Sequence, residues 1–116
     1  LYDNYVYLAE AYFNYGKIDS SFYFLKKVLG VEDKKMEKIT LAFAYSLMGY
    51  VYNFYGDYSK ALEYQFKALS IYEKIRYKKG FAIVYSFIGD VFENSGGRSS
   101  TAGRSTLLNE VVENVR

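Results

Sequence analysis

Apolar and aromatic side chains recur along this chain at the spacing of an amphipathic helix. Tyr45, Met48, Tyr52 and Tyr55 follow one another at intervals of three or four residues, which puts them on one helical face. Residues 59–75 repeat this spacing after a short break that contains a glycine, and glycine readily adopts the left-handed conformation that ends a helix. The pattern therefore predicts a helix, a tight turn and a second, antiparallel helix.

The pattern itself repeats with a period of 40 residues. The recurring positions are Tyr5, Tyr45 and Tyr85; Gly16, Gly56 and Gly96; Tyr12, Tyr52 and Phe92; and Leu8, Met48 and Ile88. Each period opens with a first helix, and we expect these first helices at residues 1–15, 41–55 and 81–95. The chain contains no proline that would interrupt them. A repeat of this length indicates stacked helix pairs.

The second period carries a motif in which small and large side chains alternate. Its residues are Tyr45-x-x-Met48-Gly49-x-x-Tyr52, then Gly56-Asp57-Tyr58, then Ala61 and Ala68. This motif resembles the tetratricopeptide repeat, in an extended form whose period exceeds the usual length of about 34 residues. The resemblance implies an all-α fold, in which antiparallel helix hairpins stack as a short right-handed α-solenoid over residues 1–96.

The other periods depart from this motif. The first period has Ala9, Ser21 and Val28 at the positions of Gly49, Ala61 and Ala68. In the second period the large aromatic that the family carries in its second helix is replaced by Gln65. The third period has a first helix but no second helix in register. We therefore expect two complete helix pairs followed by one unpaired helix.

The chain changes character after the third first helix. Residues 97–105 have the Gly- and Ser-rich composition of a flexible linker, and residues 106–116 fit a short amphipathic helix. This tail is either an extension outside the repeat family or a surrogate capping helix. Without a paired second helix, some apolar residues of the third helix are expected to have no helix packed over them: Phe81, Val84, Tyr85, Ile88 and Phe92. The tail has its own set of apolar residues: Leu107, Leu108, Val111, Val112 and Val115. Packing between these two sets would cap the monomer or form a homodimer.

Composition excludes most catalytic chemistry. The chain has no Cys and no His, so it lacks thiolate nucleophiles, imidazole bases and the usual zinc ligands. No recognised catalytic or phosphate-binding motif is present. The fifteen tyrosines recur at the spacing that core packing alone requires. We expect a protein that is not an enzyme and that needs no cofactor and no metal ion.

Charge argues against polyanions as partners. The 15 Lys and Arg residues nearly balance the 13 Asp and Glu residues, so we expect binding to neither nucleic acid nor a membrane. A local basic run around Lys78 is expected to be a solvated helix end. No run of about 18 uncharged apolar residues and no signal segment is evident, which favours a soluble, cytoplasmic chain.

The first helices show one uneven charge distribution. Residues 1–15, 41–55 and 81–95 contain four acidic residues and no Lys or Arg. In the resembled family the first helices line a concave groove, which would here be acidic and aromatic. The partner-binding residues implied by this resemblance are Asp3, Glu10, Asn14, Tyr50, Asn53, Phe54, Asp90, Glu93 and Asn94.

These observations favour a protein–protein interaction module. Its partner is expected to be a protein or peptide that presents a basic or basic amphipathic segment, because opposite charges improve encounter and specificity. Tyr50 and Phe54, one turn apart at the centre of the groove, are expected to be aromatic anchors for that partner. The alternative is a structural segment that stacks on further repeats or on another copy of itself, with no peptide ligand.

Overall fold

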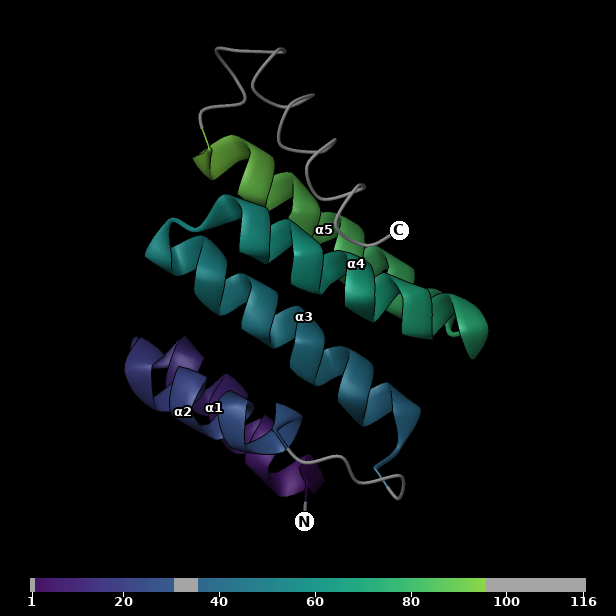
Figure 1. Ribbon diagram of the computed structural model, residues 1–116, viewed down its shortest axis with the longest axis horizontal. Coiled ribbons are helices and arrows are strands. Elements are labelled where there is room, and N and C mark those ends of the chain that lie inside the picture. The colour runs from purple at the N-terminus through teal and green to yellow at the C-terminus, as the bar shows by residue number, and fades with distance from the viewer. Residues whose placement is uncertain (1, 31–35, 96–116) are drawn as a thin grey trace.

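The protein is all-α, as the sequence predicts. The computed structural model describes residues 2–30 and 36–95, and within these ranges it contains five helices and no strand. The helices are α1 (Tyr2–Asn14), α2 (Ile18–Leu29), α3 (Lys38–Tyr55), α4 (Tyr58–Lys74) and α5 (Lys78–Asn94). Figure 1 shows α1 and α2 at one end of the described structure, α3 in the middle, and α4 with α5 at the other end.

Glycine ends two of the helices as predicted. Gly16 and Gly56 have φ angles of 80° and 85°, in the left-handed region. At each turn two backbone hydrogen bonds close the last turn of the helix: the Gly56 N–H donates to the Asn53 carbonyl, and the Asp57 N–H donates to the Tyr52 carbonyl. The chain can therefore reverse within two or three residues, which makes α1 and α2, and likewise α3 and α4, antiparallel neighbours. Gly96 lies outside the described residues.

Gly49 allows the α3–α4 pair to pack closely. A Cβ atom at this position would come within 2.8 Å of the Ala61 carbonyl oxygen and of Gln65 Nε2, both on α4. Any larger side chain would push the two helices apart. The small residue that the motif requires thus lies at the contact between the paired helices.

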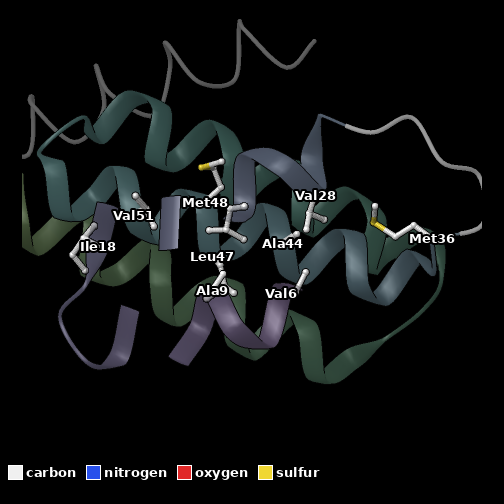
Figure 2. Close-up of a cluster of buried hydrophobic side chains, with 10 residues drawn as sticks. Val6, Ala9, Ile18, Val28, Met36, Ala44, Leu47, Met48 and Val51 are labelled. Atoms are coloured by element: carbon white, nitrogen blue, oxygen red, sulfur yellow. The ribbon is translucent and has the colours of Figure 1, made fainter. Parts of the chain in front are cut away.

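The first of two hydrophobic clusters joins α1, α2 and α3. Figure 2 shows its buried side chains converging between these helices. They are Val6, Ala9, Ile18, Leu25, Val28, Met36, Ala44, Leu47, Met48 and Val51. Burial of such apolar surface, at about 25 cal/mol per Å², supplies the main force that holds the first pair to α3.

The second cluster joins α3, α4 and α5. Its buried members are Ala42, Ala61, Leu62, Ala68, Leu69, Tyr72, Val84, Ile88 and Val91. Gly80 lets the N-terminal end of α5 approach Tyr72, because a Cβ at Gly80 would lie 2.3 Å from the ring. α3 therefore takes part in both clusters and links the two ends of the described structure.

The surroundings of α5 differ in part from the expectation. Val84 and Ile88 do not lack cover, since both are buried in the second cluster with residues of α4. Phe81 and Phe92 are partly buried against the same cluster, and Tyr85 is 59% exposed. A helix has several faces, and the first-helix pattern did not separate the face toward α4 from the opposite one. The tail residues Leu107, Leu108, Val111, Val112 and Val115 lie outside the described residues.

Candidate functional site

Three aromatic rings stack across α1, α3 and α5. The Tyr50 ring lies between Phe13 and Phe87, with centroid separations of 4.6 Å on both sides and interplanar angles of 28° and 18°. We call these three residues the aromatic ladder. It ties three helices that are far apart in sequence into one surface, with α3 at its centre.

A pocket of about 200 Å³ lies toward the N-terminal ends of the same three helices, and α4 also contributes to its walls. Its walls come from every helix but α2, and from the loop before α5: Asp3, Val6, Tyr7, Ile39, Thr40, Phe43, Tyr72, Tyr77 and Ile83. Most of these side chains are apolar or aromatic, so the pocket suits an apolar group. Burial, with a smaller contribution from the neighbouring Tyr77, raises the pKa of the Tyr72 hydroxyl to about 12.

Polar side chains link the helices at both ends of this surface. At the N-terminal end the Thr40 hydroxyl donates a hydrogen bond to the Asp3 carboxylate, at the edge of the pocket. At the C-terminal end Asn94 Nδ2 donates to Asn53 Oδ1 over 3.3 Å. The two links and the ladder hold α1, α3 and α5 in one register, so the residues between them form a fixed surface.

The two aromatic residues expected at the groove centre have different environments. Tyr50 is half-buried, and both faces of its ring are occupied by the ladder. Phe54 is 64% exposed and touches Phe13 by an edge, with centroids 6.3 Å apart. Phe54 is therefore available to a partner, whereas Tyr50 mainly connects helices. Asn53, expected to face a partner, is 5% exposed.

The carboxylates of the predicted site lie on the two outer helices of this surface. Asp3 and Glu93 are exposed, and Glu10 and Asp90 are half-buried. Glu10 and Asp90 stand 40 residues before and after Tyr50, so they occupy the equivalent register positions on α1 and α5. Asn14 is exposed at the end of α1. The centre of the surface is thus flanked by acidic side chains on both sides.

The predicted absence of basic residues from the first helices needs a correction. α3 and α5 begin three residues earlier than expected, and their first turns contain Lys38, Lys78 and Lys79. Neither a proline nor a side-chain cap stands at the expected starts, and the helices extend back through residues 38–40 and 78–80. Negative charge is therefore concentrated on α1 and on the C-terminal half of α5.

Several contributors to this surface were missed by sequence reasoning. Phe87 completes the ladder, although it does not occupy one of the groove positions implied by the family. Tyr72 and Tyr77 close the pocket from the end of α4 and the following loop. The sequence shows that these residues are aromatic. Which rings meet, however, depends on how far each helix is shifted along its axis relative to its neighbour.

Lysines on α2 and α4 pack over aromatic rings. Lys67 Nζ lies 4.8 Å from the Tyr64 ring centroid and 5.7 Å from that of Tyr45, and Lys60 Nζ lies 5.3 Å from that of Tyr52. Lys26 and Lys27 are similarly placed over rings of α2. These cations therefore cover aromatic surface on α2, α3 and α4.

Residues 2–30 and 36–95 contain no cluster of three or more metal-ligating side chains. In the same part of the chain, no helix combines the length and the apolar character needed to cross a membrane.

Comparisons of the chain with protein-family models, with curated proteins and with solved structures found no match.

Proposed function

We propose that this chain is a non-enzymatic interaction module, similar to tetratricopeptide repeats, that binds a basic amphipathic segment of a partner protein. The segment lies across α1, α3 and α5. The observation that carries the proposal is the apolar pocket beside the aromatic ladder, on a surface whose outer helices carry four carboxylates.

The pocket favours a side chain of a peptide as its occupant. Its volume of about 200 Å³ lies below the range of about 300–1,000 Å³ that is usual for small-molecule sites. Tyr7 and Ile39 at its rim are 64% and 44% exposed, so an incoming apolar side chain would bury them. A cationic group next to that side chain would reach the Asp3 carboxylate at the pocket edge.

Phe54 supplies a second contact at the other end of the surface. It follows Phe43, which lines the pocket, by eleven residues, or about 16 Å along α3. A partner helix of about three turns would span this distance. Glu10 and Asp90 flank the stretch between the two contacts, where they would meet basic side chains of the partner.

Peptide selection provides the test of this proposal. A random 15-residue peptide library selected on the chain should yield sequences that combine Lys or Arg with apolar residues. The quadruple variant D3K/E10K/D90K/E93K should lose these peptides, while E73K, which reverses one exposed charge on α4, should keep them. Binding should also weaken as salt rises, because exposed charges are screened.

Pocket variants distinguish a specific site from general attraction of charge. Tyr7→Ala and Ile39→Ala should each lower affinity several-fold, whereas Tyr15→Ala, at an 83% exposed residue outside the pocket, should not. Selection of acidic peptides, or affinities that are unchanged in the charge-reversed variant, would contradict the proposal.

A further inference from the structure

Helix α5 repeats three residues that α3 uses to hold α4. Tyr45, Ser46 and Gly49 of α3 recur 40 residues later as Tyr85, Ser86 and Gly89. Because the two helices share this register, the contacts at α3 indicate what the same residues on α5 can accept.

On α3 all three residues contact α4. Ser46 Oγ donates a hydrogen bond of 2.7 Å to Gln65 Oε1, and Gln65 Nε2 donates one of 2.8 Å to the Ser46 carbonyl. Ser46 and Gln65 are fully buried, so this pair is shielded from water. Gly49 gives the Gln65 amide and the Ala61 carbonyl their space, and the Tyr45 ring lies beneath Lys67 Nζ at 5.7 Å. We call this set of contacts the α3–α4 seam.

On α5 the equivalent residues are open. Tyr85 is 59% exposed and Ser86 is exposed. A Cβ atom on Gly89 would meet nothing within 4 Å. Within the part of the chain that the structure describes, neither Tyr85 nor Ser86 has a side-chain hydrogen bond or ring contact. We call Tyr85, Ser86 and Gly89 the open face of α5.

We propose that the open face of α5 binds a helix of another protein that carries the pattern Ala-x-x-x-Gln-x-Lys, as α4 does at Ala61, Gln65 and Lys67. The Ala would allow close approach at Gly89, the Gln amide would pair with Ser86, and the Lys would cover the Tyr85 ring. This surface is distinct from the pocket and the ladder, so the inference does not depend on the function proposed for them.

Composition argues against two occupants that residues 1–116 could themselves supply. Gln65 is the only glutamine in the sequence, and it is already buried in the α3–α4 seam. Neither residues 96–116 nor a second folded copy of this chain can therefore supply the glutamine.

A synthetic peptide with the sequence of residues 57–75 is a suitable probe, because it carries the pattern of α4. Fluorescence anisotropy of the labelled peptide with the full chain should show saturable binding. Gly89→Leu should weaken binding by at least about tenfold, since a large side chain would separate the helices, and Ser86→Ala should weaken it by about two- to tenfold. Both positions are exposed, so circular dichroism should report unchanged folding.

Matched controls test whether the contacts are those proposed. Ser70→Leu, which adds the same side chain at an exposed position of α4, should leave binding unchanged. A probe peptide with leucine in place of its glutamine should bind the original chain more weakly than the original probe binds to Ser86→Ala. This difference is expected because Ser86→Ala removes only the bond from the serine hydroxyl, whereas loss of the glutamine also removes the bond to the backbone carbonyl.

Four results would overturn the proposal. The first is that the probe does not bind, and the second is that Gly89→Leu binds it as tightly as the original chain. The third is a dimer in light scattering that Gly89→Leu converts to a monomer, since a second copy would then occupy the face. The fourth is probe binding gained only when Leu108→Asp and Val112→Asp disrupt the tail, which would make the tail the occupant.

Discussion

At the scale of single residues, the turns that follow α1, α3 and α4 are closed by the same pair of backbone hydrogen bonds. They differ in the residue that takes the left-handed conformation, which is glycine in the first two turns and arginine in the third. After α4 the Arg76 N–H donates to the Glu73 carbonyl and the Tyr77 N–H donates to the Tyr72 carbonyl, as at the glycine turns. Arg76 has a φ angle of 58°, so an arginine occupies the left-handed position that Gly16 and Gly56 occupy elsewhere. A non-glycine residue in this region costs about 1 kcal/mol or more.

We expect Arg76→Gly to increase the free energy of unfolding by up to about 1 kcal/mol. The gain arises because glycine removes the left-handed strain, and it is reduced by the larger entropy of glycine in the unfolded chain. Gly56→Ala makes the opposite change at the equivalent turn and should lower the free energy of unfolding by about 1 kcal/mol. Urea unfolding followed by circular dichroism measures both effects. A loss of stability in Arg76→Gly would mean that the arginine side chain contributes more than its backbone costs.

The sequence predicted the glycine turns but not the arginine turn. Glycine is the residue that adopts positive φ most readily, so Gly16 and Gly56 marked helix ends by themselves. Arg76 carries no such mark. The turn it forms lies next to the close packing of Tyr72 against Gly80, which depends on how α4 and α5 are paired. Gln65 was recognised as a departure from the motif, whereas its bonds to Ser46 depend on how α3 and α4 are paired.

At the scale of elements, the aromatic ladder connects α1, α3 and α5 through a single residue of α3. Tyr50 contributes both stacks, and each aromatic pair stabilises by about 0.5–1.5 kcal/mol beyond the burial of area. Phe54 makes edge contacts with Phe13 and Tyr55 and remains largely exposed. The two residues therefore differ in what their removal would do, although they lie one turn apart.

We expect Tyr50→Ala to lower the free energy of unfolding by about 1–3 kcal/mol through the loss of two stacks. Phe54→Ala should lower it by less than about 1 kcal/mol and should weaken binding of the peptides selected on the chain. Denaturant midpoints and peptide affinities of both variants provide the measurements. Equal losses of stability in the two variants would contradict this assignment of roles.

The ladder was only partly predictable from the sequence. Tyr50 occupies a groove position implied by the family resemblance, but Phe87 does not. Rings from three parallel helices stack diagonally, because each helix is staggered relative to its neighbour. The 40-residue period identifies which residues are equivalent between helices. The axial shift that brings nonequivalent residues into contact is set by how the helices pack, which the period does not reveal.

At the scale of the whole molecule, the two hydrophobic clusters share α3. α3 and α4 have the most extensive contact of any helix pair in the described ranges, and α1 and α5 lie at opposite ends of the stack. In stacked repeats stability comes from each repeat and from its nearest neighbours, so a terminal helix with one open side is held by fewer interactions. The all-α architecture followed from periodicity alone, because helical spacing and glycine turns are local signals.

Hydrogen exchange should reflect this arrangement. We expect the slowest amide exchange in α3 and α4, and faster exchange in α1 and in α5, because local opening requires less free energy where fewer apolar contacts are lost. Mass spectrometry of the exchanged chain, with peptides covering each helix, provides the measurement. The Tyr85–Gly89 segment is the most informative, since its open face has no cover within the described residues. Protection of this segment equal to that of α4 would contradict the expectation and would indicate that another part of the chain, or a second copy, covers α5 in solution.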